Sequence, residues 1–232
     1  MQKFLIVTIK FWNIDNFSKY TKNFEGEWYL ISKKEELSLE NVEKINPNKI
    51  FFVHWSWVIP KEIFEKYECV LFHMTDLPYG RGGSPMQNLI VRGKYDTKIS
   101  ALRVVQELDA GDIYLKKPLN IEHGTAEEIL TKASDIIYQM IDEILSKDLK
   151  PKPQEGEIVK FMRRKPEDGN IKDLNNIKKI YDYIRMLDGE SYPPAFLEIG
   201  NIKYEFLKPM LKDSKLEAKV IITKGDELNN EE

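Results

Sequence analysis

The sequence predicts an α/β fold: a Rossmann-like, mostly parallel sheet flanked by helices, followed by a small C-terminal α+β appendage. In the first half of the chain, short apolar and β-branched runs alternate with segments of helical character. Such alternation is typical of a parallel sheet that is covered on both faces. After a proline-containing segment near residue 150 the pattern changes to one helix and short strands, which indicates an appendage.

Four apolar runs predict the parallel strands, at residues 4–9, 28–31, 50–53 and 69–73. Helices are expected between them at 37–45, where Ser38 marks the start, and at 60–67, where Pro60 lies in the first turn. Further helices are predicted at 85–91, 126–146 and 174–187, and further strands at 98–108, 113–119, 196–199 and 204–207.

The domain organisation follows from the segment at 150–153, which reads Lys-Pro-Lys-Pro and is the clearest linker in the chain. We expect a main domain at 1–150, the appendage at 151–226 and a disordered acidic tail at 227–232.

Composition excludes several classes of protein. The net charge of −3 and the pI of about 5.8 argue against a nucleic-acid partner, since phosphate binding usually needs a basic surplus. No apolar stretch approaches the roughly 18 to 20 residues that span a bilayer, so no membrane partner is expected. The single cysteine, Cys69, and the strand-like N-terminus fit a cytoplasmic protein. The oligomeric state stays open, with a homodimer as one expectation.

Polar residues gather where two of the predicted strands end. Ligands of open parallel sheets bind beyond the carboxyl ends of the strands. The third strand is followed by His54, Trp55, Ser56 and Trp57, and the fourth ends at His73, before a loop with a hydroxyl, an acid, an arginine and three glycines. The turn after the first strand has no glycine, which excludes a dinucleotide fingerprint.

An ordered motif begins at His73 and reads His-x-Thr-x-Leu-Pro-x-x-Arg-Gly-x-x-Pro as far as Pro85. It continues with Gly93, Thr97 and the Leu-Asp-Ala-Gly-Asp run at 108–112. This pattern resembles the signature of folate-dependent formyltransferases, which include methionyl-tRNA, glycinamide ribonucleotide and sugar N-formyltransferases. The resemblance extends over residues 60–125 and implies the formyltransferase fold.

The second half of the chain resembles the same family more weakly. The stretches at 163–169, 184–185 and 192–196 are similar to the segment that closes the catalytic domain in aminosugar and methionyl-tRNA formyltransferases.

The resemblance implies a mechanism around His73 and Asp109. An amine would attack the formyl carbon of N10-formyltetrahydrofolate, and a protonated His73 would stabilise the resulting oxyanion. Asp109 would hold the imidazole, favour its charged form and accept a proton from the attacking ammonium. Because the formyl donor is already activated, and the three histidines lack ligand spacing, we expect no metal.

The resemblance also implies further site residues. Those expected to bind the folate are Trp55, Ser56, Trp57, Val58, Ile59, Leu71, Glu107 and Leu108. Those expected to bind the substrate are Thr75, Arg81, Gly82, Arg163 and Arg164. Each has a structural alternative: Arg81 could only fix the glycine turn, the two tryptophans could cover the sheet edge, and Arg163 with Arg164 could form a solvated charged face.

One residue departs from the family pattern. The family has an asparagine two residues before the histidine, as a second oxyanion donor, where this chain has Leu71. Losing such a donor costs about 3 to 4 kcal/mol of transition-state stabilisation. His54, Ser56, Thr75 and Asn88 are the candidate replacements.

The acceptor expected from the resemblance is the amino group of a nucleotide-linked amino sugar. A UDP-4-amino-4,6-dideoxyhexose, or a pseudaminic-type precursor, of bacterial glycan biosynthesis is the preferred substrate, because the segment after the linker is short for the basic domain of a tRNA enzyme. The alternatives are another amine, such as that of methionyl-tRNA, and a catalytically impaired module that binds folate or a nucleotide sugar.

Overall fold

The computed structural model describes residues 1–190 and 192–224, which form two compact units. Unit 1 comprises Met1–Pro85, Asp96–Asn120 and Leu130–Phe161, and unit 2 comprises Met86–Tyr95, Ile121–Ile129 and Met162–Glu232. The tail predicted at 227–232 lies outside the described residues. Among the described helices, none has the length and apolar character needed to cross a membrane.

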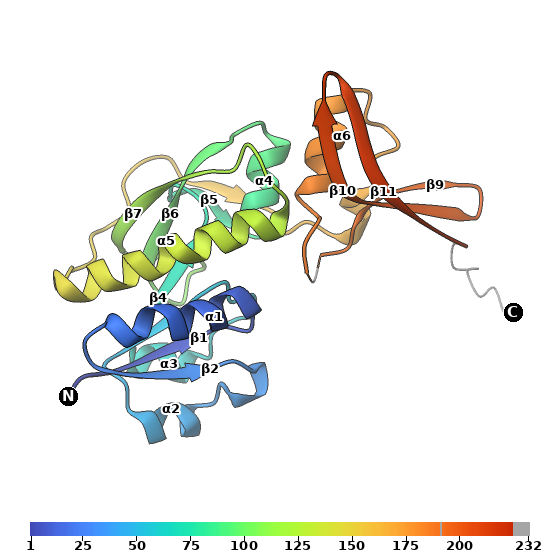
Figure 1. The fold of residues 1–232 in the computed structure, drawn as a ribbon. Coiled ribbons are helices and arrows are strands. Elements are labelled where there is room, and N and C mark those ends of the chain that lie inside the picture. The colour runs from blue at the N-terminus through green and yellow to red at the C-terminus, as the bar shows by residue number, and fades with distance from the viewer. Residues whose placement is uncertain (191, 225–232) are drawn as a thin grey trace, which may run out of the picture. The chain divides into compact units, whose positions relative to one another are not determined.

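Unit 1 is built on a six-stranded sheet in the order β2-β1-β3-β4-β6-β7 (Figure 1). The strands are β1 (Lys3–Val7), β2 (Glu27–Ile31), β3 (Lys49–Phe52), β4 (Glu68–His73), β6 (Asp96–Arg103) and β7 (Ile113–Asn120). The first four are parallel to one another, and β6 and β7 extend the sheet antiparallel. The predicted mostly parallel α/β fold is therefore confirmed, and the strand predicted at 98–108 is corrected to end at Arg103.

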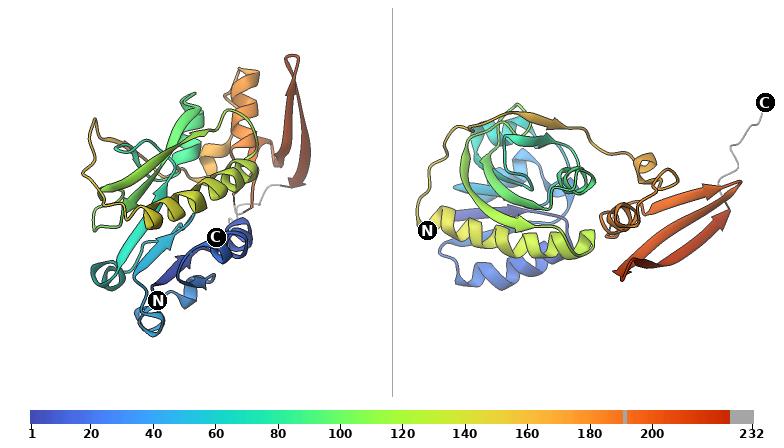
Figure 2. Two further views of the ribbon diagram at one scale, coloured as in Figure 1. Left: turned by 60° about the vertical axis from the view of Figure 1, so that its left-hand side comes forward. Right: turned by 90° about the horizontal axis from the view of Figure 1, so that it is seen from above.

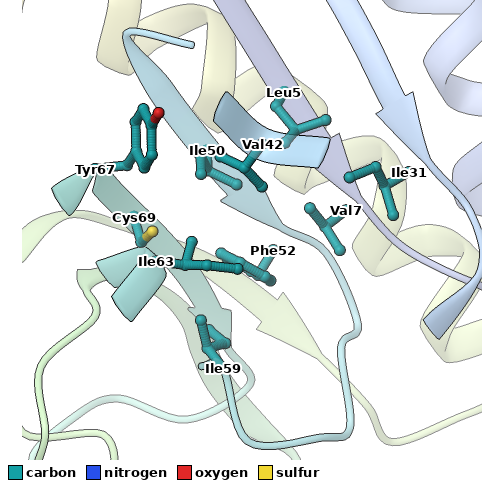
Figure 3. Close-up of a cluster of buried hydrophobic side chains, with 10 residues drawn as sticks. All are labelled: Leu5, Val7, Ile31, Val42, Ile50, Phe52, Ile59, Ile63, Tyr67 and Cys69. Carbon is teal, nitrogen blue, oxygen red and sulfur yellow. The ribbon is translucent and has the colours of Figure 1, made fainter. Parts of the chain in front are cut away.

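One face of this sheet packs against α2 (Leu39–Ile45) and α3 (Lys61–Lys66). Alternate residues of the strands form the buried cluster with Val42 of α2 and Ile63 of α3 (Figure 3). The strand members of the cluster are Leu5, Val7, Ile31, Ile50, Phe52 and Cys69. Removing these side chains from water stabilises the unit by roughly 1.5 to 3 kcal/mol for each fully buried one.

The helix α1 (Phe11–Tyr20) and the part of α5 (Ala126–Ser146) that belongs to unit 1, from Leu130, lie side by side (Figure 1). The Asn16 amide donates to the Ser134 hydroxyl over 2.8 Å, and the Tyr138 hydroxyl donates to the Asn13 carbonyl over 2.7 Å. The predicted capping box starts α5, because the Thr125 amide and the Glu128 carboxylate bond at 2.8 Å.

The helix α1 was not predicted from the sequence. Its N-cap residue, Lys10, makes no side-chain capping bond, so the segment lacks a start signal. Its interior contains two asparagines and an aspartate, which disfavour helix. Contacts with α5 from more than a hundred residues further along the chain compensate for this weak local preference.

A small parallel ladder was also missed. Strand β5 (Tyr79–Gly82) pairs with β8 (Val159–Phe161), so the glycine-rich segment predicted as a turn is a short strand. Its partner lies about 80 residues away, and neither segment has the apolar alternation that predicts a strand alone. Two 3₁₀ turns, η1 (Thr21–Asn23) and η2 (Lys34–Glu36), complete the elements of unit 1.

Unit 2 contains α4 (Pro85–Val91, from Met86), the 3₁₀ turn η3 (Pro166–Gly169), α6 (Ile177–Arg185) and a three-stranded antiparallel sheet. The sheet order is β11-β10-β9, with β9 at Ala195–Ile199, β10 at Ile202–Lys212 and β11 at Lys215–Lys224, and α6 packs on β10 (Figure 2). Strand β11 was not predicted, and β10 is longer than predicted. β11 is largely exposed and β10 is only half-buried, and both contain several lysines, so neither has the continuous apolar run of a buried strand.

Arg185 organises the interior of unit 2. Its side chain is fully buried, and its Nε donates to Asp182 Oδ1 over 2.7 Å. Its Nη1 donates to the carbonyls of Ile121 and Gly124 over 2.9 and 3.1 Å, which joins α6 to a segment about 60 residues earlier. Tyr95 donates from its hydroxyl to Asp182 Oδ2 over 2.7 Å and brings in a third segment.

We expect Arg185→Met to destabilise unit 2 by about 3 kcal/mol, because it leaves the buried Asp182 and two carbonyls without their main donor. The measurement is a urea titration followed by amide hydrogen exchange in α6. Lys179→Ala, an exposed change on the same helix, should stay within about 0.5 kcal/mol of the unchanged chain. A loss below 1 kcal/mol for Arg185→Met would contradict the organising role.

Candidate active site

His73 ends β4 at the carboxyl edge of the parallel strands, and only 8% of its side chain is exposed. Its Nε2 lies 2.8 Å from the carbonyl oxygen of Gly80. Because a carbonyl can only accept a hydrogen bond, Nε2 carries a proton in this arrangement. The loop behind the ring is held by Ser100, which donates to the Thr75 carbonyl over 2.7 Å and accepts from the Leu77 amide over 3.3 Å.

Asp109 reaches His73 from the loop between β6 and β7. Asp109 Oδ1 lies 3.6 Å from His73 Nδ1, and its Oδ2 accepts from the Gly82 amide over 2.9 Å. A ring protonated on both nitrogens therefore faces an oxygen on each side, the Gly80 carbonyl and the Asp109 carboxylate. The structure thus brings together the two residues that the sequence motif singled out.

Two glycines allow this approach. A Cβ on Gly111 would lie 1.8 Å from the Arg103 carbonyl oxygen, and one on Gly82 would lie 2.3 Å from that of Phe161. Asp109 itself has a φ of 53°, a left-handed conformation that aspartate tolerates better than most residues. A side chain at Gly111 would push the Asp109 loop away from the end of β6, and one at Gly82 would push β5 away from β8.

Gln154 holds this loop in place, and the sequence analysis missed it. Its Oε1 accepts from Arg81 Nε and Nη2 over 3.1 and 2.9 Å. Its Nε2 donates to the carbonyls of Asp109 and Gly111, both over 2.8 Å. Gln154 follows the segment predicted as a linker, and nothing in the local sequence distinguishes it from a solvated loop residue.

The predicted substrate-binding residues of the loop are engaged within it. Arg81 is buried, bonds to Gln154 and lies 3.7 Å from Glu107 in an ion pair. Thr75 is fully buried, and its hydroxyl lies 3.5 Å from the same Gly80 carbonyl that His73 contacts. Gly82 presents its amide to Asp109. Contact of these residues with a substrate stays a prediction.

The loop after β3 and the loop after β6 lie over one cluster. Trp55, Leu71 and Val104 pack against it, and Ile59 is a buried member. Other apolar side chains of these loops face solvent: Trp57 is 36% exposed, Leu108 is 67% and Val58 is 92%. Ser56 and Glu107 are exposed as well. Exposed apolar side chains at the ligand-binding edge of a sheet are typical of a binding surface.

The candidate replacements for the family asparagine are not equivalent. Leu71 packs into the cluster and has no donor. Asn88 belongs to unit 2 and donates to the Met162 carbonyl over 2.9 Å. Ser56 is exposed. Thr75 shares a carbonyl with His73, which makes it the candidate with a described connection to the ring.

His54 belongs to a separate polar cluster at the ends of β1 and β3. Its Nδ1 accepts from Trp12 Nε1 over 3.1 Å and lies 3.3 Å from Asn13 Nδ2. Its Nε2 is buried without a partner among the described residues. Burial, and then the charge of Lys10, lower the pKa of His54 to about 4. His54 is therefore neutral at pH 7, with its proton on Nε2.

Arg163 and Arg164, the remaining predicted substrate residues, belong to unit 2. Arg163 is exposed, and Arg164 lies over the ring of Tyr183 at 5.3 Å and donates to the Asp168 carbonyl. Among residues 1–190 and 192–224, no cluster of three or more His, Cys, Asp or Glu side chains could hold a metal ion.

Two family models match the chain. The model described as "Formyl transferase" matches residues 18–142, and the model described as "Methionyl-tRNA formyltransferase, C-terminal domain" matches residues 166–223. The chain is also 28% identical over 202 residues to a methionyl-tRNA formyltransferase of Thermodesulfovibrio yellowstonii, which covers 84% of this chain and 65% of the relative. The chain thus spans less than two thirds of that relative's length.

The comparison with solved structures agrees with these sequence matches. A methionyl-tRNA formyltransferase from Clostridium thermocellum superposes with a TM-score of 0.93 and 51% identity, over 97% of this chain and 100% of that one. A sugar N-formyltransferase from Shewanella sp FDAARGOS_354 superposes with a TM-score of 0.63 and 15% identity, over 98% and 99% of the two chains. The second likeness shows the fold alone.

These matches overturn two expectations. The preference for a nucleotide-linked amino sugar is wrong, because the high identity is to a methionyl-tRNA formyltransferase, whereas the likeness to the sugar N-formyltransferase is in the fold alone. The exclusion of a nucleic-acid partner is wrong for the same reason, supported by the match of residues 166–223 to a tRNA enzyme's C-terminal domain. The expectation rested on the short length of the segment after the linker and on the net charge of the whole chain, and neither distinguishes the acceptor.

We expect the protein to lose stability as the pH falls from about 6.5 to about 4. In this window His54 takes up a proton in the unfolded chain. In the folded chain its pKa is lowered to about 4, so it stays neutral. Its contribution is about 1 to 3 kcal/mol. Urea midpoints between pH 7 and 4 measure it.

His54→Asn should flatten this pH dependence. Asparagine keeps an acceptor for Trp12 and tolerates the φ of 48° at this position, but it does not titrate. The control is His123→Asn at a histidine with an 83% exposed side chain, which should leave the profile unchanged. Equal profiles for all three proteins would refute the assignment to His54.

Proposed function

Since the chain belongs to the formyl transferase family, we propose that it transfers a formyl group from N10-formyltetrahydrofolate to the amino group of methionyl-tRNA. The observation that carries the proposal is the 51% identity, over nearly the whole chain, to a methionyl-tRNA formyltransferase with a TM-score of 0.93. The match of the C-terminal residues to the corresponding domain of that enzyme class supports the acceptor.

The loops around His73 fit a formyl donor that carries a flat ring system. Exposed Trp57, Val58 and Leu108 offer apolar surface for such a ring. The residues that would hold the donor are Trp55, Ser56, Trp57, Val58, Ile59, Leu71, Glu107 and Leu108. When bound, the donor supplies an activated formyl carbon.

The chain's own residues supply charge and orientation. His73, held by the Gly80 carbonyl and faced by the Asp109 carboxylate, would stabilise negative charge on the formyl oxygen as the amine attacks. Asp109 would take the proton that the amine nitrogen loses after its attack, directly or through water, and breaking of the bond between the formyl carbon and N10 would release tetrahydrofolate. Since Leu71 offers no donor, His73 would carry more of the oxyanion stabilisation than in relatives with asparagine.

His73→Ala should lower kcat/KM for formylation of methionyl-tRNA by at least about 100-fold, because it removes the charged donor at the reacting carbon. Asp109→Asn should cause a loss of about 10²- to 10⁴-fold. The readout is formyl-methionyl-tRNA by mass spectrometry after release of the amino acid. His123→Ala is the matched histidine control. No product from the unchanged chain with this donor and acceptor would end the proposal.

Gln154→Ala should lower kcat about 10- to 100-fold, because the Asp109 loop loses the hydrogen bonds to the Asp109 and Gly111 carbonyls. KM for the donor should change less, because the surface expected to bind the donor stays intact. Gln154→Glu should also be impaired, since its second oxygen would face the Asp109 and Gly111 carbonyls. Gln106→Ala, an exposed glutamine of the same loop, is the control. A kcat unchanged by Gln154→Ala would show that the clamp does not position Asp109.

A further inference from the structure

Unit 2 contains a cleft that the residues at His73 do not explain. It lies between the end of α4 and the beginning of α6, entirely within unit 2, and has a volume of about 540 Å³. This is within the range of about 300 to 1,000 Å³ of small-ligand sites. Its walls differ in character: Ile90, Val91 and Leu174 are apolar, and Arg92, Lys178 and Lys179 are basic.

The charges of this cleft, which we call the α4–α6 cleft, sum to a positive value. Asp182 is its acidic member, and its carboxylate is already neutralised by Arg185 at 2.7 Å and Lys178 at 2.9 Å. Two cations on one carboxylate leave a net positive charge. Arg92 adds to this charge at one wall, and Lys179, which makes no ion pair with any described residue, adds to it at the other. Glu122 lies near enough to influence Tyr95 and is the opposing acid.

The basic side chains are held in place rather than scattered. Arg92 donates from Nη1 to both the carbonyl and the side-chain oxygen of Asn88 over 2.8 Å, and Asn88 in turn donates to Met162. Lys178 lies 4.7 Å from the centre of the Tyr95 ring and bonds to Asp182. Pre-ordered cations beside apolar side chains suit a ligand that carries a phosphate next to a base or sugar.

We propose that the α4–α6 cleft binds one nucleotide of the RNA acceptor, with its phosphate against Arg92, Lys178 and Lys179. The inference rests on the proposed function, because it takes the acceptor to be an RNA. The apolar side chains of Ile90, Val91 and Leu174 would contact the ribose or base. The open space beside Gly93, where an added Cβ would meet no atom within 4 Å, leaves room for the RNA backbone to pass. The cleft contributes affinity and register and takes no part in the chemistry.

Lys179→Ala and the double variant Arg92→Ala/Lys179→Ala test the cleft in the full chain, with methionyl-tRNA as the probe. The Kd from fluorescence anisotropy should rise about 3- to 10-fold for Lys179→Ala. It should rise about 10- to 100-fold for the double variant. The slope of log K against log salt should fall by about 0.7 to 0.9 for each lost phosphate contact. KM for methionyl-tRNA should rise in parallel, with kcat at saturation within twofold of the unchanged chain.

The matched control is Lys219→Ala, which removes the same charge from an exposed position on β11 of the same unit. Unfolding midpoints confirm that each variant is folded. Unchanged Kd and salt slope in the double variant, or an equal effect of Lys219→Ala, would overturn the proposal for the cleft and leave the formylation activity standing. A chain that forms no formyl-methionyl-tRNA would instead remove the proposed function.

Discussion

The arrangement of the site depends on one constraint, the approach of Asp109, in the loop between β6 and β7, to within 3.6 Å of His73 at the end of β4. His73 is fixed by the end of β4, but Asp109 lies in a nine-residue connection between antiparallel strands, where the chain has no regular structure to hold it. A carboxylate that is 4% exposed in such a loop needs compensation for its lost hydration. The Gly82 amide and the ring of His73 provide that compensation.

Backbone atoms do most of this positioning. The Gly80 carbonyl orients the ring, the Gly82 amide binds the carboxylate, and Gln154 binds the Asp109 carbonyl. Backbone groups lose little conformational entropy when they bind, because the β5–β8 ladder has already fixed them. The glycines of this loop therefore allow backbone groups to lie close to His73 and Asp109. Arg81 supports the same arrangement through its hydrogen bonds to Gln154.

The sequence predicts the features that short-range patterns encode. The four parallel strands and the capping box of α5 follow from apolar runs and a four-residue signature, and His73 and Asp109 follow from an ordered motif. Helix α1, the β5–β8 ladder and Gln154 depend on partners about 45 to 125 residues away, and their own segments carry no distinguishing pattern. Such elements are fixed by tertiary contacts, which override weak local preference.

The wrong expectation about the acceptor arose because the net charge is a sum over the whole chain. A net charge of −3 describes the whole chain, whereas phosphate binding depends on the field within a few ångströms of a few side chains. In the interior of unit 2, the Asp182 charge is already paired with Arg185 and Lys178, so it subtracts little from the neighbouring cations. Formal charges counted over a sequence treat this carboxylate as equal to an unpaired one in solution. Local positive potential can therefore coexist with an acidic composition, and only the pairing of individual residues shows where.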